Sequence, residues 1–370
     1  MPGDDATSGV VSADDLRAFC VNALTKVGVG EAAAQTTADV LVTTDTWGVF
    51  THGVKGLHGY IRRIQAGGIG ADARPRVTAE GLGWAIVDGD SALGMVAATF
   101  AMRAAIEKAR ACGVGYAGVF NSCHFGAAGY YAAMAAAEDM IGLAMANDAP
   151  SVTAPGARGR VTGSNPLAYA VPTGSGMPIL LDMATSTVAG GKVSAAHALG
   201  KLIPGGWVVD VEGRPTTDPS AFLAGGALTP MAGHKGYGLA LLIEILAAVL
   251  TGAAVTRQVV PWIVGDPSIP TEHGAAFLAV NIAAMMPIDQ FKRRVDALAR
   301  EIRESPLAEG ADRVYLPGEI EWERRKASLV EGILLPDDVR LSVAALSREL
   351  GIAALKSGTI EAPSPDEPRP

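Results

Sequence analysis

The chain has 370 residues, of which 49% are apolar and 18% charged, so it can bury a core large enough for two domains or one elaborated domain. Its net charge is −8 and no stripe of lysine and arginine is visible, which argues against nucleic acid as a partner because phosphate binding needs clustered positive charge. Three cysteines are too few for a disulfide scaffold and lack the spacing of a zinc site. We therefore expect a reduced, cytoplasmic setting and no metal.

Neither a membrane segment nor a secretory leader is expected. The longest apolar run, residues 239–255, contains Glu244 and is shorter than a membrane span of roughly 20 residues. It is more typical of a buried core helix. Residues 1–5 are acidic and carry no apolar segment of the kind that a signal peptide requires.

The first 70 residues predict three helices. Ser12, Asp14 and Asp15 are typical of a capped helix start, and Gly28 ends that helix. Two more helices are expected at 31–47 and 53–66.

From about residue 76, strand-like and helix-like segments alternate. The expected strands cover residues 83–90, 114–120, 141–146, 167–171, 179–181 and 275–282. The expected helices between them cover residues 95–112, 127–138, 187–199 and 236–250. The chain then predicts helices only, at residues 289–304, 319–331 and 337–350.

These patterns predict an α/β fold with composition boundaries near residues 75 and 287. Residues 1–75 and 287–352 would join into one helical domain, and residues 76–286 would form an α/β domain. The tail, 353–370, holds several prolines and acidic residues, and we expect it to be disordered. No internal repeat is visible.

The segment 121–128 carries the strongest chemical signal. His124 follows an apolar, strand-like run and precedes a segment of small residues that can begin a helix. Histidine exchanges protons near neutral pH, and a loop after a strand is a common place to present it. Asn121 and Ser122 could orient the imidazole, while the first amides of the following helix could favour an anion. The alternative is that His124 only packs or caps the helix.

A second histidine, His52, follows Thr51 and precedes a glycine. Thr51 could be a simple helix cap and His52 a surface residue, so this motif is weak when taken alone.

Residues 113–118 match G-x-G-x-x-G, but a helix is expected before them and a strand after them. A dinucleotide-binding fingerprint requires the reverse order, so we reject a Rossmann fold.

Three further loops combine glycine with small polar or charged residues. Asn165 lies in the first, residues 182–186 form the second, and His234 and Lys235 lie in the third, where an apolar helix begins. Such loops could bind a polar cofactor, and a lysine at a helix start suits a phosphate. Ordinary turn and cap chemistry, or a solvated lysine, would explain them equally.

These pieces, in this order, resemble the malate/L-lactate dehydrogenase family of non-Rossmann NAD(P)-dependent 2-hydroxyacid dehydrogenases. The resemblance covers residues 12–352. It rests on six ordered motifs that contain Thr51-His52-Gly53, Asn121–Ala127, Gly163–Pro166, Asp182–Ser186, Lys235–Gly238 and Pro317–Glu319.

The resemblance implies a homodimer that uses NAD or NADP, with a nucleotide-binding domain in the middle of the chain. His124 would be the proton-transfer histidine and His52 a second active-site histidine. Thr51, Lys55 and Asp148 would lie on the substrate side. The cofactor would contact Asn165, Asp182, Met183, Ala184, Thr185, Ser186, His234, Lys235, Gly318 and Glu319.

One departure concerns Gly56, where family members commonly have arginine. A substrate carboxylate favours a cationic partner, ideally arginine. Either Lys55, Arg62 or Arg158 replaces it, or the glycine enlarges the pocket. We favour the second option, which predicts longer or substituted 2-oxo acids rather than pyruvate or oxaloacetate.

The sequence therefore predicts an oxidoreductase that transfers a hydride between a nicotinamide cofactor and a small 2-hydroxy or 2-oxo carboxylate. Histidine would supply acid/base catalysis. A cyclic-imine reductase of the piperideine-2-carboxylate type and a catalytically silent nucleotide-binding protein are the alternatives.

Overall fold

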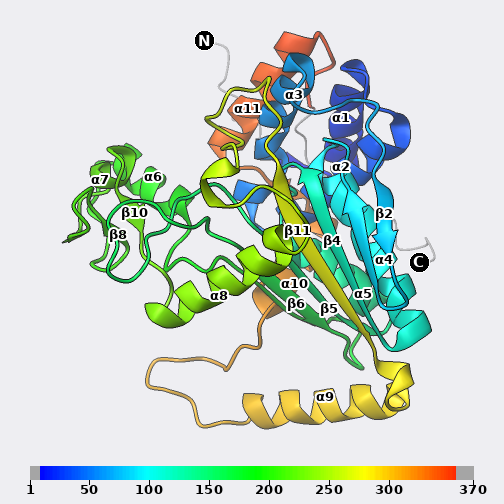
Figure 1. Ribbon diagram of the computed structural model, residues 1–370. Coiled ribbons are helices and arrows are strands. Elements are labelled where there is room, and N and C mark those ends of the chain that lie inside the picture. Colours follow the sequence, from blue (N-terminus) through cyan, green and yellow to red (C-terminus); the bar gives the residue numbers. More distant parts are fainter. Residues whose placement is uncertain (1–8, 356–370) are drawn as a thin grey trace, which may run out of the picture.

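A seven-stranded mixed sheet forms the centre of the computed structural model, which describes residues 9–355 (Figure 1). The strand order is β2-β3-β4-β11-β5-β6-β7, and only β3 and β4 are parallel neighbours. In chain order the strands are β2 (Arg76–Glu80), β3 (Trp84–Asp88), β4 (Val114–Ser122), β5 (Met140–Ala146), β6 (Leu167–Val171), β7 (Ile179–Met183) and β11 (His273–Asn281).

Four strands of this sheet, β3, β4, β5 and β7, run in the same direction. Strands β4 and β5 flank β11 and are both antiparallel to it, and β7 is related to β5 through the intervening antiparallel β6. The ends of β4, β5 and β7 therefore meet at one edge of the sheet. The beginnings of β6 and β11 lie at the same edge, so the loops attached to these five strand ends converge there.

Helices cover both faces of the sheet. On one face α4 (Gly94–Cys112) packs on β4, and α5 (Ala128–Ala137) packs on β5. On the other face lie α8 (His234–Glu244) and the π-helical turn η3 (Ile245–Val249), which contact β11 and β5. The apolar run 239–255 was expected to be a buried helix, but α8 and η3 bury one side only. Their outward side exposes Leu241, Leu242, Ile245, Val249 and Leu250.

Helices from the two chain ends pack together (Figure 1). A short sheet joins β1 (Val10–Val11) to β12 (Ile333–Leu334). As expected, Ser12 caps the first helix, because its hydroxyl accepts a hydrogen bond from the Asp15 amide. The helices of this group are α1 (Ala13–Lys26), α2 (Glu31–Thr46), α3 (Leu57–Ala66), α10 (Glu319–Glu331) and α11 (Asp337–Leu350).

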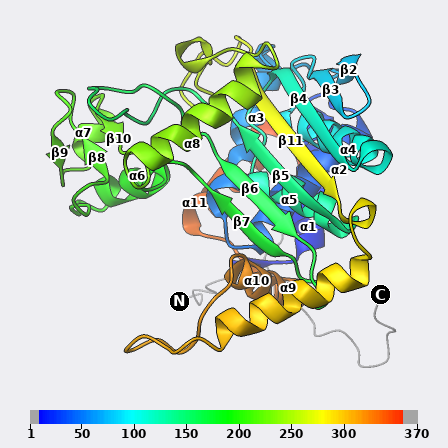
Figure 2. The same cartoon turned by 60° about the horizontal axis from the view of Figure 1, so that its bottom comes forward.

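Helix α9 (Ile288–Arg303) does not join this group, although the sequence placed residues 287–352 there. It lies at the opposite end of the sheet (Figures 1 and 2). Asp296 accepts a hydrogen bond from the Gly174 amide in the turn between β6 and β7, and Lys292 pairs with Asp139. These contacts hold α9 against the far sheet edge.

A small lobe projects from the sheet (Figures 1 and 2). Its three-stranded sheet has the order β10-β8-β9, and a separate apolar cluster around Val193 and Val208 fills it. The sequence did not predict these two-residue strands, and the expected helix 187–199 begins only at Gly190. The lobe contains α6 (Gly190–Ala198), α7 (Ser220–Leu223), β8 (Val208–Val209), β9 (Pro215–Thr216) and β10 (Ala227–Leu228).

Local geometry explains two further outcomes. Gly113 ends α4 and β4 begins at the next residue, which confirms the helix-before-strand order used to reject a Rossmann motif. The helix expected at 53–66 begins at Leu57, because residues 50–56 form two 3₁₀ turns, η1 (Phe50–His52) and η2 (Val54–Gly56). Further 3₁₀ turns are η4 (Thr256–Gln258) and η5 (Ile282–Ala284).

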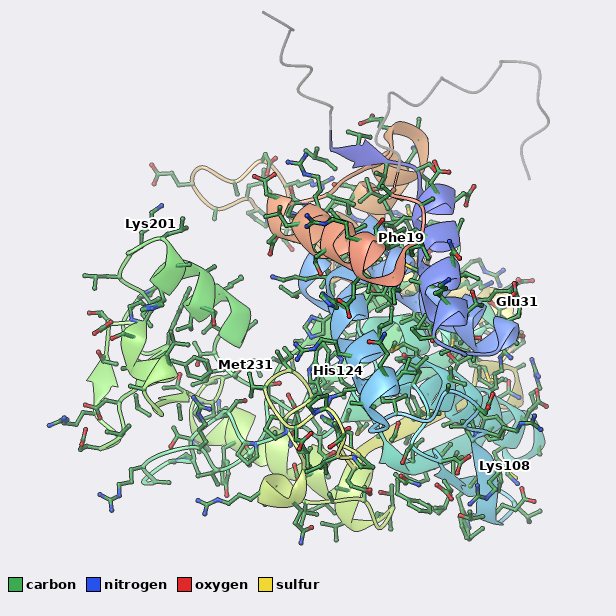
Figure 3. All side chains as sticks on the ribbon, turned by 90° about the horizontal axis from the view of Figure 1, so that it is seen from above. Phe19, Glu31, Lys108, His124, Lys201 and Met231 are labelled. Carbon is green, nitrogen blue, oxygen red and sulfur yellow. The ribbon has the colours of Figure 1, made fainter. Side chains whose placement is uncertain are left out.

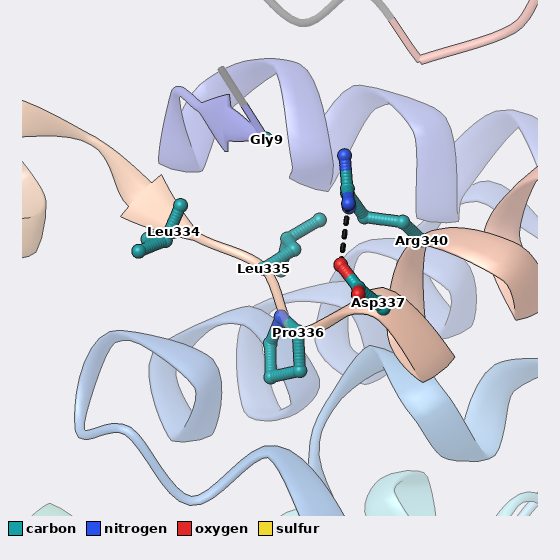
Figure 4. A pocket seen from close by; sticks show the side chains of 6 residues that line it. All are labelled: Gly9, Leu334, Leu335, Pro336, Asp337 and Arg340. Atoms are coloured by element: carbon teal, nitrogen blue, oxygen red, sulfur yellow. Dashed lines mark hydrogen bonds and ion pairs between the residues drawn. The ribbon is translucent and has the colours of Figure 1, made fainter. Parts of the chain in front are cut away.

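A shallow pocket at the junction of the chain ends holds no reactive group of the sequence motifs (Figure 4). Gly9, the loop 334–336 and an ion pair between Asp337 and Arg340 line it. We assign it no function. Of the helices in residues 9–355, none has both the length and the apolar character needed to cross a membrane.

The sequence predicts disorder for residues 353–370. Most of this segment, residues 356–370, lies outside the described residues, as do residues 1–8.

Candidate active site

The sheet edge where these loops converge brings together three of the predicted site residues. His124 follows the end of β4, Asp148 follows the end of β5, and Asp182 is the second-last residue of β7. His273 begins β11 and is paired in register with Ser122. Seen from above, His124 lies between the helical group that carries Phe19 and the lobe that carries Lys201 (Figure 3).

The imidazole of His124 is fixed by two aromatic neighbours. The Tyr60 hydroxyl lies 2.6 Å from Nδ1, and the indole of Trp262 stacks on the ring with centroids 4.3 Å apart and planes 11° apart. The Gly126 amide also points at Nδ1, at 3.4 Å. Since Nδ1 is engaged, Nε2 is the nitrogen that remains for a ligand.

Burial keeps this pair uncharged near neutral pH. Desolvation, followed by the nearby His52 and His273, holds the pKa of His124 well below its usual value, although Asp148 acts in the opposite direction. Burial raises the pKa of Tyr60 well above its usual range. A neutral imidazole has one unprotonated ring nitrogen and can accept a proton there, and Asp148 is the nearby group that favours the charged form that results.

His52 lies beside His124, with ring centroids 5.6 Å apart. Its Nδ1 lies 2.9 Å from the Thr51 hydroxyl, so Thr51 contacts the imidazole and is not a helix cap. Burial lowers the pKa of His52, against the effect of the Asp182 and Asp148 carboxylates. The sequence motif Thr51-His52 thus places a second neutral imidazole next to the first.

A buried carboxyl group supports the turn that carries His52. The Val54 amide donates to Asp45 Oδ2 at 3.0 Å, and a Cβ on Gly53 would lie 1.8 Å from Oδ1, so glycine is required there. Oδ1 is buried and has no partner among the described residues. Burial raises the pKa of Asp45 to about 8.

Asp148 pairs with His273. His273 Nε2 lies 3.2 Å from Asp148 Oδ1, and the imidazole is almost completely buried. Burial alone would raise the pKa of Asp148, but the hydrogen bond and charge of His273 outweigh it, so the pKa lies below its usual value. The Asp148 carboxylate is therefore ionised while the imidazoles of His52 and His124 are neutral.

A buried polar network holds the Asp148 loop. Asn165 accepts a hydrogen bond from the Asp148 amide at 3.2 Å and donates to the Ala240 carbonyl and to Glu244. Asn147 also donates to Glu244, at 3.2 Å. The side chain of Asn165 is completely buried. It was expected to contact a cofactor, but these bonds engage its amide and give it a structural role.

The loop 182–186 lies beside the start of α8. The Met231 amide donates to the Thr185 carbonyl at 2.8 Å, and Ser186 forms an isolated bridge with Pro230. His234 and Lys235 follow in the first turn of α8 and are exposed. Gly318 contacts β7, where the Leu180 amide donates to Pro317. The structure thus joins the three expected cofactor segments, of which Met183 and Ala184 are half-buried.

Several side chains in these segments are engaged by the protein, in contrast to the expectation that they would be free to bind a ligand. The hydroxyls of Thr185 and Ser186 donate to the carbonyls of Ser164 and Val188. Glu319 pairs with Arg303 and accepts from the Leu316 amide. What this loop presents to a ligand is therefore mainly backbone.

Asp182 is already bonded to the protein. Its Oδ2 accepts from the Gly129 amide at 2.7 Å, so this carboxylate occupies the helix start at which we expected an external anion. Asn121 was expected to orient the imidazole, but it bonds Asp88 and Ser91.

The structure does not support either explanation for Gly56. Lys55 Nζ lies 2.5 Å from Asp338, so its charge is paired on the surface rather than free for a substrate, and Arg62 and Arg158 are exposed. The volume beside Gly56 is filled rather than enlarged, because Tyr60 and Trp262 occupy it. The predicted enlarged pocket is therefore wrong.

Sequence reasoning missed three site residues, Tyr60, Trp262 and His273. His273 could have been found, because it is one of only six histidines and precedes an apolar strand. Tyr60 lies in the first turn of helix α3, a short distance along the chain from His52. Trp262 belongs to a loop with no recognisable motif, and only the folded chain brings it to His124. No group of three or more histidine, cysteine or acidic residues suited to a metal occurs in the described part of the chain.

The chain is similar to known proteins over nearly its whole length. Residues 11–343 match the family profile described as malate/L-lactate dehydrogenase. Malate dehydrogenase of Pyrococcus abyssi is 37% identical, covering 93% of this chain and 95% of that protein. L-Sulfolactate dehydrogenase of Methanocaldococcus jannaschii is also 37% identical, covering 93% and 98%. The structure of malate dehydrogenase from Pyrococcus horikoshii superimposes with a TM-score of 0.86 at 35% identity, covering 96% and 99%.

Proposed function

Since the chain belongs to the malate/L-lactate dehydrogenase family, we propose that it oxidises a 2-hydroxy carboxylate, or reduces the 2-oxo acid, with His124 as the acid/base group. The family assignment makes the protein a dehydrogenase that uses a nicotinamide cofactor. The observation that supports the role of His124 is its geometry. Its Nδ1 is bonded to Tyr60, which leaves Nε2 for a ligand, and His52 and Asp148 are near enough to act on the ring.

Residues 182–186, 234–235 and 318–319 fit the cofactor. The exposed Lys235 and the open amides at the start of the 11-residue helix α8 suit the negative charge of a pyrophosphate. The backbone of the 182–186 loop lies next to them. When bound, the nicotinamide ring accepts or supplies the hydride, and the protein supplies position and proton transfer.

The proton moves at His124. In the oxidation direction the imidazole is in the tautomer whose Nδ1–H donates to the Tyr60 oxygen, so the unprotonated Nε2 accepts the alcohol proton. In the reduction direction the imidazolium donates this proton to the carbonyl oxygen. The ionised Asp148 stabilises the imidazolium form, because it acts to raise the pKa of His124.

The outward side of α8 supports the proposal that the protein is a homodimer. Five large apolar side chains, between 43% and 62% exposed, lie on α8 and on the residues that continue it. Contiguous exposed apolar surface is typical of a protein interface. Light scattering during size-exclusion chromatography should give twice the chain mass, and Leu242→Glu should lower it.

Steady-state turnover tests the proposed reaction. A panel of 2-oxo acids is offered with NADH and with NADPH, and the product of the wild-type reaction is identified. His124→Asn should lower kcat by about 10²–10⁴-fold, the usual contribution of a general acid/base. His58→Asn is the matched control, because this histidine pairs with Glu349 on the surface.

The other outcomes of this panel are also informative. Reduction of a cyclic imine alone would favour the imine reductase. Tight cofactor binding without turnover of any 2-oxo acid or imine would indicate a silent scaffold. Near-normal turnover in the folded His124→Asn protein would contradict the role of His124.

A further inference from the structure

Trp262 lies against the hydrogen-bonded pair Tyr60–His124. Its indole is stacked on both rings, at 4.3 Å from the His124 centroid and 5.0 Å from the Tyr60 centroid, with interplanar angles of 11° and 12°. The two covered rings are themselves inclined by only 23°. One indole therefore covers one face of the pair and keeps water from that side of the 2.6 Å hydrogen bond.

Two glycines make room for this indole. A Cβ on Gly56 would lie 3.2 Å from Tyr60 and 3.4 Å from Trp262 Cη2, and a Cβ on Gly59 would lie 3.2 Å from Trp262 Cζ3. Any larger side chain at position 56 would have to displace the aromatic rings. Because Gly56, just before helix α3, has no side chain, the Trp262 ring from a distant loop can lie against it.

A buried arginine holds that loop in place. Arg63 is 1% exposed, and it donates to the carbonyls of Pro261 at 2.9 Å, Trp262 at 2.7 Å and Ile269 at 2.9 Å, with a longer bond of 3.3 Å to Asp266. Its guanidinium is thus bonded to loop carbonyls and is not available to a substrate carboxylate. The cation stabilises the loop rather than the ligand.

From this arrangement we infer that Trp262 is a specificity-determining and positioning residue of the active site, and that it selects substrates whose side chain, beyond the reacting C–O group at His124, is uncharged and apolar. The inference rests on the proposed function. Trp262 is only half-buried, and the indole surface that His124 and Tyr60 leave uncovered offers dispersion contacts to an alkyl or aryl group, whereas it gives a carboxylate no hydrogen bond in exchange for lost water. Asp148, which acts on the His124 ring, would repel a second carboxylate.

The substrate class follows from this chemistry. We expect 2-oxo monocarboxylates with an aliphatic or aromatic side chain to be preferred over 2-oxo dicarboxylates. The preference comes from the aromatic contact and not from extra volume, since the space beside Gly56 is filled.

The first test compares kcat/KM for 2-oxo-4-methylpentanoate, phenylpyruvate and oxaloacetate. The wild-type enzyme should prefer the first two, and Trp262→Ala should reduce that preference by about tenfold or more, in the range of a lost apolar pocket contact. Trp84→Ala is the matched control, because this tryptophan is 44% exposed at the start of β3, outside the site. An unchanged preference in Trp262→Ala, or oxaloacetate as the best wild-type substrate, would overturn the inference.

The second test does not depend on turnover. In Trp262→Ala, water reaches the His124 ring, so its NMR titration midpoint should rise toward that of an exposed histidine. Trp262→Phe should restore much of the wild-type value. If Trp262→Ala fails to fold, Gly59→Val displaces the indole from the other side and should shift the midpoint in the same direction. An unchanged midpoint in a folded variant would contradict the positioning role.

The two proposals fail separately. If no substrate is turned over but the His124 midpoint shifts in Trp262→Ala, the proposed reaction is refuted and the positioning role of Trp262 is supported. Turnover through His124 with no change on removal of Trp262 would retain the reaction and refute this inference.

Discussion

Tyr60 and His273 are buried and His124 is half-buried, and hydrogen bonds and stacking fix their rings. By contrast, His234 and Lys235 are exposed in the first turn of α8, and neither side chain bonds another described residue. The two sides of one site are thus built differently. Proton transfer depends on distances that vary by only tenths of an ångström, so its groups are held by the core. Phosphate binding depends on charge and open amides, which an exposed helix start provides.

The largest expected effect separates the two sides. His124→Asn should lower kcat by about 10²–10⁴-fold while the dissociation constant of the cofactor stays within about twofold, because no cofactor segment bonds this ring. Stopped-flow turnover and fluorescence titration on the same preparation measure both quantities. A large loss of cofactor affinity would show that the two sides are not independent.

The reciprocal change concerns Lys235. Lys235→Ala should weaken cofactor binding by about 1–3 kcal/mol if the ammonium meets a phosphate, and should leave kcat at saturating cofactor unchanged. The same fluorescence titration measures it, with exposed Lys201→Ala as the control. An unchanged dissociation constant would indicate that Lys235 is an ordinary solvated lysine that does not contact the cofactor.

A smaller effect is expected from the hydroxyl of Tyr60. Tyr60→Phe keeps the stack with Trp262 and removes one hydrogen bond to Nδ1, which is worth about 0.5–1.5 kcal/mol, or roughly 3–10-fold in kcat. The pH profile of kcat should also move, because the imidazole loses its partner. Equal loss of kcat and of thermal stability, with an unchanged pH profile, would indicate that Tyr60 only fills space.

The smallest effect concerns stability and pH. The pKa of Asp45 is raised to about 8 by burial. Above about pH 4 the unfolded carboxyl ionises while the folded one keeps its proton, so the free energy of unfolding falls as pH rises toward 8. Asp45→Asn removes this dependence. The difference in Tm, variant minus wild type, should therefore grow between pH 5 and pH 8; a constant difference would mean that Asp45 is ionised in the fold.

Much of the fold and part of the site could be predicted from the sequence, for physical reasons that differ between residues. His124 and Asp148 follow apolar strands, and a short continuous apolar run that gives way to polar residues identifies such strand ends. Strands β8, β9 and β10 have two residues each, too few for any periodicity. Trp262 and Arg63 meet through contacts between residues about 200 positions apart, which no local pattern encodes. Local sequence patterns thus identified His124 and Asp148, whereas the side chains that surround them are determined by tertiary packing.

Titration of the His124 ring by NMR, with selectively labelled histidine and His124→Asn for assignment, tests the central claim most directly. The claim is that core burial keeps the catalytic imidazole neutral at its fixed position. The His124 signal should stay in its neutral form from pH 8 to well below the usual midpoint of about 6.5. A midpoint at or above 6.5 would show that the ring is solvated, and it would contradict the account.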